Sequence, residues 1–112
     1  MATGKSYVVL VYVAPDGTRP FIEWLDSIKD PNNVERVWQR LDRFKLGNLG
    51  DIKPVKGRNG LFEARLFFGP GYRLYFALEQ NRLVVLFCGG DKGTQRSDIR
   101  KAQSLFDAYR SE

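Results

Sequence analysis

Two stretches in the second half of the chain alternate apolar and polar residues with the period of two that is typical of half-buried strands. In Phe62–Phe68 the even positions are apolar and the odd positions include charged residues, and in Tyr72–Leu78 the even positions are again apolar. A third strand is predicted at Leu83–Cys88, because its continuous apolar run is typical of a strand covered on both faces. The pattern therefore predicts two hairpins, the first with one apolar and one charged face.

The loop of the first hairpin decides which side chains face each other. A three-residue loop, Gly69–Gly71, keeps the apolar positions of both strands on one face, because register fixes the face of every side chain. This register sets Arg65 opposite Tyr75 on the exposed, charged face, with Glu63 and Arg73 nearby. We expect the apolar face to pack on helices.

The second hairpin is expected to place Lys92 near the charged face of the first hairpin. A tight turn at Gln80 and Asn81 leads into the third strand, and counting across it pairs Arg73 with Cys88. The chain leaves this strand through two glycines and an aspartate, so Lys92 should emerge at the same end of the sheet as Arg73. The pattern predicts a basic cleft rather than scattered surface charge.

A helical hairpin is predicted between the first strand and the sheet. Apolar residues at helical spacing indicate one helix from Pro20 to Asp30 and a second from Asn32 or Asn33 to about Leu46. The second helix divides into a buried stripe of Val34, Val37, Trp38, Leu41 and Phe44 and a solvent-facing basic ridge of Arg36, Arg40 and Arg43. The apolar face of the sheet is the surface that such a hairpin would cover.

Strands and a helix are also predicted elsewhere. The β-branched run Tyr7–Val13 indicates an N-terminal strand, which is too short to span a bilayer and follows no convincing cleavage site in Met1–Val13. Ile52–Val55 is a possible short strand, and Thr94 or Ser97 caps a last helix through Tyr109. We expect a cytoplasmic protein without a membrane partner.

These elements predict one α+β domain over residues 1–112. Its expected architecture is an N-terminal strand, a helical hairpin packed on a twisted antiparallel sheet, and a C-terminal helix. At 112 residues with 43% hydrophobic side chains, the chain is long enough for one core.

Charge and composition narrow the chemistry. The net charge of +5 favours an anionic partner, and the excess is local, because residues 43–73 hold seven lysines and arginines against two acidic residues. The chain has no histidine, which excludes serine triads, metalloprotease sites and two-histidine ribonucleases. Cys88, the only cysteine, fits a reducing compartment and reads as a core residue rather than a nucleophile.

Three phrases resemble a known family. GNLGDIKPV at Gly47–Val55, LFEARLFFGPGYRLYF at Leu61–Phe76 and LVVLFCGGDKGTQRSDIRKA at Leu83–Ala102 are similar to the addiction-module killer, or HigB-like, branch of the RelE/ParE toxin superfamily. The resemblance implies a RelE-like fold and the toxin of a type II toxin–antitoxin pair, held inactive by an antitoxin of the helix-turn-helix DNA-binding kind. RelE-like members cut messenger RNA on the ribosome without a metal or cofactor.

The resemblance also implies site residues. Arg73 matches the phosphate-stabilising arginine of the family, Arg65 lies where a strand lysine is found, and Lys92 matches a basic position after the last strand. Another strand lysine of the family falls on Glu63, and the C-terminal tyrosine of RelE falls near Ile99. The acid and base of the reaction therefore do not transfer directly.

The chemistry of the side chains indicates roles for these residues in a metal-free endoribonuclease site. Arg65 and Arg73 would hold phosphate, Lys92 would add positive charge, and Glu63 or Asp91 would take a proton. Tyr75 would donate a hydrogen bond or stack on a base, and the expected RNA contacts outside the centre are Lys53, Lys56, Arg58 and Arg43.

Two of these residues have structural alternatives. A cross-strand ion pair between Glu63 and Arg65 is favoured over catalysis by Glu63, whereas the sequence offers no obvious structural partner for Arg73. Two other functions stay open: a ParE-like inhibitor of DNA gyrase, and a catalytically silent module that binds RNA or the antitoxin.

Overall fold

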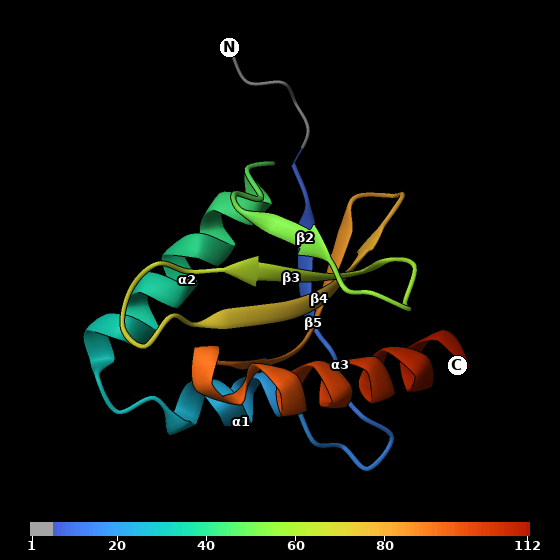
Figure 1. Ribbon diagram of the computed structural model, residues 1–112. Helices are drawn as coiled ribbons and strands as arrows, with labels where there is room; N and C mark the ends of the chain where they lie inside the picture. The colour runs from blue at the N-terminus through green and yellow to red at the C-terminus, as the bar shows by residue number, and fades with distance from the viewer. Residues whose placement is uncertain (1–5) are drawn as a thin grey trace.

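A five-stranded mixed sheet, with strand order β1-β5-β4-β3-β2, is the middle layer of a compact α+β fold (Figure 1). The computed structural model describes residues 6–112. The strands are β1 (Val8–Val11), β2 (Ile52–Pro54), β3 (Leu61–Arg65), β4 (Arg73–Glu79) and β5 (Leu83–Gly90). The helices are α1 (Pro20–Ser27), α2 (Pro31–Lys45), the short 3-10 turn η1 (Lys92–Thr94) and α3 (Gln95–Arg110). The expectation that no leader precedes the first strand falls partly on residues 1–5, which lie outside this description.

The sequence had predicted an antiparallel sheet, and this was wrong, because the sheet is mixed. β1 runs parallel to β5, with Val8 opposite Leu83 and Val11 opposite Leu86, whereas the pairs β5-β4, β4-β3 and β3-β2 are antiparallel. Parallel neighbours need a long crossover, and here the whole chain between β1 and β5 provides it. Residue alternation marks a strand but says nothing about its direction, so the error concerns pairing and not the strand itself.

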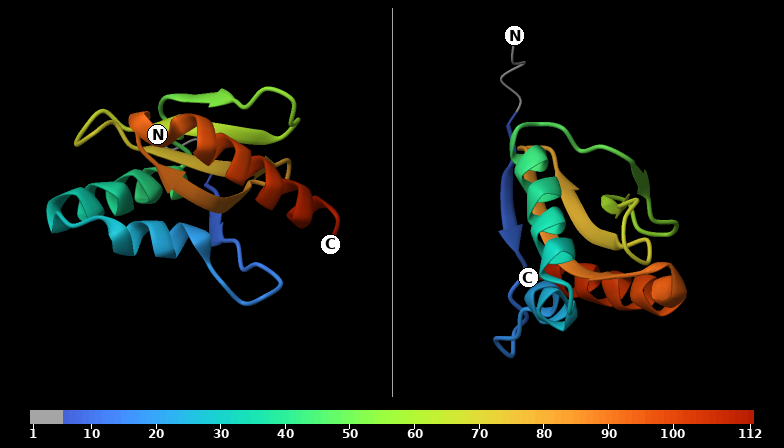
Figure 2. Two further views of the ribbon diagram at one scale, coloured as in Figure 1. Left: turned by 60° about the horizontal axis from the view of Figure 1, so that its bottom comes forward. Right: turned by 90° about the vertical axis from the view of Figure 1, so that its left-hand side faces the viewer.

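Helices cover both faces of the sheet (Figure 2). The pair α1 and α2 packs on one face through a core that includes Phe21, Val37, Leu41 and Phe44. On the opposite face, α3 contributes Ala102 and Phe106 to a second core with Tyr75, Phe87 and Cys88 from the strands. The face that was expected to be exposed and charged is therefore partly covered by α3.

The helical hairpin lies where it was predicted, but α1 ends at Ser27 rather than at Asp30, and two side chains of α2 differ from their predicted burial. α2 begins at Pro31, and the carboxylate of Asp30 accepts a hydrogen bond of 2.9 Å from Asn32 N, which caps the helix. Trp38 was expected to be buried but is exposed. Arg40 was expected on the solvated ridge but is buried, because its guanidinium donates to the carbonyls of residues 49, 51 and 65.

The register of the first hairpin differs from the predicted one by two residues. Arg65 lies opposite Arg73, and Glu63 lies opposite Tyr75. The loop is longer than three residues, because the last cross-strand hydrogen bond joins Leu66 N to Tyr72 O. Gly69 and Gly71 within this loop have positive φ, which glycine adopts without steric cost. A shift of two leaves every side chain on its predicted face.

The second hairpin contains a bulge that the sequence did not indicate. Arg73 pairs with Gly90, not with Cys88, which lies opposite Tyr75 instead. The register shifts between Tyr75 and Phe76, so Phe87 and Cys88 both face the core under α3. The turn also extends to Arg82, which has a φ of 61°.

Candidate functional site

The two arginines proposed to bind phosphate are direct neighbours. Arg65 and Arg73 occupy opposite positions of β3 and β4, so their side chains leave the same face of the sheet. Two like charges in this arrangement repel each other, and each is offset by a carboxylate. Arg65 contacts Asp51 at 3.1 Å, and the Nε atom of Arg73 lies 3.8 Å from Glu63.

The two arginines differ in how free they are. Arg65 is 40% exposed, whereas Arg73 is 12% exposed and donates from Nη1 to the carbonyl of Gly71 at 2.7 Å. The sequence had offered no structural partner for Arg73, and this was wrong, because Gly71 and Glu63 both contact it. Its buried Nε atom has no hydrogen-bond partner among residues 6–112.

Glu63 is the centre of a buried polar network. Its Oε2 atom accepts a hydrogen bond of 3.0 Å from the Tyr75 hydroxyl and one of 2.7 Å from Gln95 Nε2. The side chain is 1% exposed, and its Oε1 atom has no hydrogen-bond partner within the described chain, although Lys53 Nζ lies 3.7 Å away. The expected ion pair of Glu63 with Arg65 is absent from the ion pairs of residues 6–112, where Lys53 and Arg73 take its place.

Tyr75 is not available to a ligand. Its side chain is fully buried under α3, and burial, followed by the nearby Glu63 carboxylate, raises the pKa of its hydroxyl far above the ordinary value. The expectation that Tyr75 stacks on a base is therefore wrong. Its hydroxyl instead orients the Glu63 carboxylate.

Lys92 lies beside Arg73, as the sequence had indicated. A Cβ atom placed on Gly71 would lie 3.4 Å from Nη1 of Arg73 and 3.7 Å from Cβ of Lys92. Asp91, the alternative proton acceptor, has a structural role, because its carboxylate accepts from the backbone nitrogens of Gly93 and Thr94 and caps η1.

A cavity of about 310 Å³ opens between β2 and α3 beside this network. Its walls include Lys53, Lys56, Glu63, Ile99 and Gln103. The volume is at the lower end of the range of small-molecule sites. The Glu63 carboxylate, with its unpartnered oxygen, belongs to the wall of this cavity.

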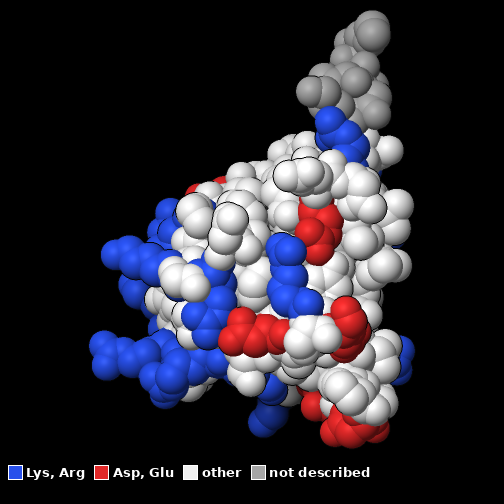
Figure 3. Space-filling model, turned by 90° about the vertical axis from the view of Figure 1, so that its right-hand side faces the viewer, with Lys and Arg blue, Asp and Glu red and all other residues white. Residues whose placement is uncertain are grey.

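Basic side chains border the cavity on both sides. Lys53 and Lys56 are exposed on the β2 side. Gln103 Nε2 donates a hydrogen bond to Lys56 O, so the side of α3 that carries Gln103 faces the β2 segment. Arg96 and Arg100 are exposed and lie on this side of the helix, because they precede Gln103 by seven and three residues. In Figure 3, lysine and arginine side chains gather along the left edge of the molecule. Arg96 and Arg100 were not among the predicted site residues, although their spacing of four was a readable signal in the sequence.

One expected RNA contact lies apart from this surface, and a second is engaged in an ion pair. Arg43 is exposed on α2, in the layer on the opposite face of the sheet. Arg58 forms a two-pronged contact of 2.8 and 2.9 Å with Asp107, and this hydrogen bonding raises the pKa of its guanidinium. The structure therefore brings together Arg65, Arg73, Lys92, Lys53, Lys56 and Glu63, and leaves out Arg43.

Comparison with known proteins finds a relative in Haemophilus influenzae that carries the name "Uncharacterized protein". It is 42% identical over 88 residues, which cover 79% of this chain and 87% of the relative. The chain belongs to the family of this protein. No family model matches the sequence, and no solved structure matches it.

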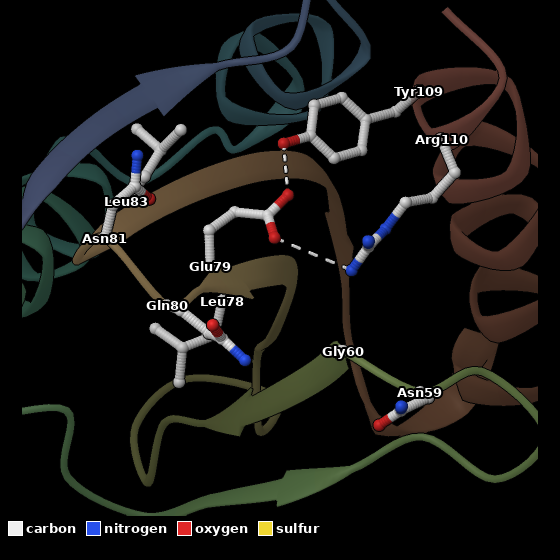
Figure 4. Close-up of a pocket in the computed structure, with 9 residues that line it drawn as sticks. All are labelled: Asn59, Gly60, Leu78, Glu79, Gln80, Asn81, Leu83, Tyr109 and Arg110. Atoms are coloured by element: carbon white, nitrogen blue, oxygen red, sulfur yellow. Dashed lines mark hydrogen bonds and ion pairs between the residues drawn. The ribbon is translucent and has the colours of Figure 1, made fainter.

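A larger cavity, of about 580 Å³, lies at the opposite end of β4 (Figure 4). Its carboxylate, Glu79, accepts a hydrogen bond from the Tyr109 hydroxyl and lies 3.6 Å from Arg110. One oxygen of Glu79 thus has a hydrogen bond and the other an ion pair with Arg110, much as Oε1 of Glu63 has Lys53 at 3.7 Å. The cavity beside Glu63 is smaller, but its carboxylate is more deeply buried and its rim carries Lys53 and Lys56.

The described chain also lacks two kinds of feature. Within residues 6–112, no three His, Cys, Asp or Glu side chains are grouped so that they could hold a metal ion. No helix in this part of the chain has both the length and the apolar character needed to cross a bilayer.

Proposed function

We propose that the chain is a RelE-like toxin of the addiction-module killer branch, the toxic half of a type II toxin–antitoxin pair. Its activity would be cleavage of messenger RNA on the ribosome without a metal ion. The observation that carries the proposal is the direct cross-strand pairing of Arg65 with Arg73, with Lys92 beside them and Glu63 behind. Neighbouring guanidinium groups on one face suit a phosphate, because each can donate two parallel hydrogen bonds.

The proposed reaction uses the ribose 2′-hydroxyl as nucleophile. Its oxygen attacks the adjacent phosphorus while its proton passes to Oε1 of Glu63, the carboxylate oxygen that has no hydrogen-bond partner within residues 6–112. Arg65 and Arg73 stabilise the negative charge of the pentacoordinate phosphorus. The bond to the 5′-oxygen breaks, and this oxygen takes a proton from the ammonium group of Lys53 or Lys92.

Lys53 controls access to the proposed base. Its ammonium group lies 3.7 Å from Oε1 of Glu63, on the side of the cavity. A phosphate that approached would attract this ammonium group and expose the carboxylate oxygen to the 2′-hydroxyl. The Tyr75 and Gln95 hydrogen bonds would meanwhile hold the other oxygen in place.

The proposed partner is an antitoxin in the bacterial cytoplasm. It would cover the face of Arg65 and Arg73 with acidic or apolar segments and so prevent RNA from entering. A small neighbouring reading frame that encodes a helix-turn-helix protein would support this assignment, and co-purification of the two products would test it.

Incubation of purified protein with ribosomes and a defined messenger RNA, followed by mapping of the cut ends, tests the activity. We expect cuts with the wild type, a loss of at least about a hundredfold in Arg65→Ala because a transition-state charge partner is removed, and wild-type cutting in Arg43→Ala. Wild-type protein that leaves the message intact would refute the nuclease. Inhibition of gyrase supercoiling by the same preparation would then assign the ParE type of activity.

A catalytically silent RNA-binding module is the second candidate. The observation in its favour is that the structure occupies most of the expected acid and base groups. Tyr75 is buried and Asp91 caps η1. Of this set only Glu63 borders a cavity, and one of its oxygens already accepts two hydrogen bonds. RNA binding that weakens steeply with salt, without any cleavage, would favour this candidate.

A further inference from the structure

Phe67 is the most exposed aromatic side chain among residues 6–112. Its side chain is 77% exposed, whereas the preceding Leu66 is buried and the following Phe68 is partly buried against the core. An apolar ring in water contributes nothing to folding, because the hydrophobic effect acts on area removed from water. The fold of this chain therefore gives Phe67 no packing role.

The loop that carries Phe67 is held in place on both sides. Leu66 N donates to Tyr72 O at 3.0 Å, and Gly71 N donates to Phe68 O at 3.1 Å. The Phe68 ring packs on Tyr72 with a centroid distance of 5.6 Å and lies 4.2 Å from the guanidinium carbon of Arg36. A ring that projects from an anchored loop loses less conformational entropy on binding than one on a free loop.

Phe67 lies on the same face as the phosphate-binding arginines. It follows Arg65, the last residue of β3, by two positions, and the guanidinium carbon of Arg65 is 5.8 Å from the centre of its ring. Arg73 is directly opposite Arg65. An exposed ring thus stands next to two positive charges.

We propose that Phe67 stacks on an unpaired base of single-stranded RNA while Arg65 and Arg73 hold the neighbouring phosphates. This inference rests on the proposed function and adds to it a position that binds a base. Aromatic rings beside a cationic groove bind single strands in this way, with little preference for sequence because every base has a flat face.

The surroundings of Phe67 favour RNA over a protein partner. The anchor of a protein interface sits within a larger apolar area, and Phe67 is instead followed by exposed Gly69 and Pro70 and preceded by Arg65. The exposed apolar side chains Val8 and Leu10 belong to β1, at the opposite edge of the sheet.

The test measures the affinity of the full chain for a fluorescent eight-nucleotide RNA by anisotropy. Phe67→Leu keeps an apolar side chain but removes the ring, and we expect its affinity to fall about tenfold, with a salt dependence unchanged because no charge is lost. Phe67→Tyr, which keeps a ring, should bind like the wild type. Leu46→Ala, a change at an equally exposed apolar residue at the end of α2, should also have no effect.

A scan of single abasic positions along the RNA gives the second measurement. One abasic position should weaken binding of the wild type about tenfold and cause no further loss in Phe67→Leu, because the two changes remove the same contact. Equal affinities of Phe67→Leu and the wild type would overturn the inference, and so would additive losses at every position.

If the wild type cuts RNA but Phe67→Leu binds normally, the inference fails while the nuclease stands. If Phe67 matters for binding and nothing is cut, the nuclease fails while the inference stands, and a wild type that binds no RNA overturns both.

Discussion

Gln95 Nε2 donates a hydrogen bond of 2.7 Å to Oε2 of Glu63, and this contact joins the first residue of α3 to the middle of β3. The same carboxylate faces Lys53 and Arg73 and borders the cavity beside β2. A group at the centre of the proposed site is therefore also part of what holds α3 on the sheet. Stability and function should be coupled at this residue.

Replacement of Glu63 should reveal that coupling. In Glu63→Leu, the Tyr75 hydroxyl and the Arg73 Nε atom stay buried without a carboxylate, so we expect the free energy of unfolding to fall by about 3 kcal/mol. Urea denaturation at pH 7 measures it. Asp42→Leu, which removes an exposed ion pair with Lys45, is the control and should cost less than about 0.5 kcal/mol. Equal losses in the two variants would show that the Glu63 network adds nothing to stability.

Arg40 provides a second test of a buried polar group. Its guanidinium donates hydrogen bonds to three backbone carbonyls that connect α2 to the chain around β2 and β3. Arg40→Met should lower the free energy of unfolding by about 3 kcal/mol, because it leaves those carbonyls without donors. Arg43→Met, one turn later on the exposed side of the same helix, should change it by less than about 0.5 kcal/mol. Thermal or urea unfolding of the two variants measures this difference. Equal stability of Arg40→Met and Arg43→Met would contradict the structural role of Arg40.

Cys88 should make stability depend on pH in the alkaline range. Burial raises the pKa of its thiol from 9.0 to about 12. Below pH 9 both the folded and the unfolded thiol are protonated, and above it the unfolded thiol loses its proton first, so stability falls as pH rises from 9 toward 12. At pH 10 this loss should be about 1.4 kcal/mol relative to pH 8.

The contribution of Cys88 can be separated by a variant. Cys88→Ala removes the titrating thiol, so its stability should fall less between pH 8 and 10 than that of the wild type, while the tyrosines contribute equally to both. In the folded wild type, a thiol reagent at pH 8 should react much more slowly with Cys88 than it does in urea. Fast modification of the folded protein would contradict the buried position.

Residue patterns predicted most elements of the fold because local periodicity determines them. The stripe of Ala102 and Phe106 on α3 and the alternation along β3 and β4 follow directly from which positions are apolar. The pairing of Arg65 with Arg73 did not follow, because a register two residues away buries the same side chains. Loop geometry at Gly69 and Gly71, which sequence does not reveal, makes the choice.

The packing of α3 over the charged face of β3 and β4 was the main feature that could not be predicted from the sequence. Glu63, Tyr75 and Gln95 meet across a separation of 32 residues between Glu63 and Gln95, and no local pattern encodes such a contact. Charged and polar positions on a strand were read as exposed, whereas here they satisfy one another beneath α3. Arg40 was misread for the same reason, because its partners are backbone carbonyls from distant segments.

Mapping of transcript ends in bacteria that express the chain tests the central claim most directly. Induction of the wild type should arrest growth and produce new 5′ ends within coding regions, whereas Arg73→Ala should do neither, and Lys45→Ala, which changes an exposed lysine on α2, should behave like the wild type. Growth arrest by the wild type without new transcript ends, or the same ends in Arg73→Ala, would contradict the account.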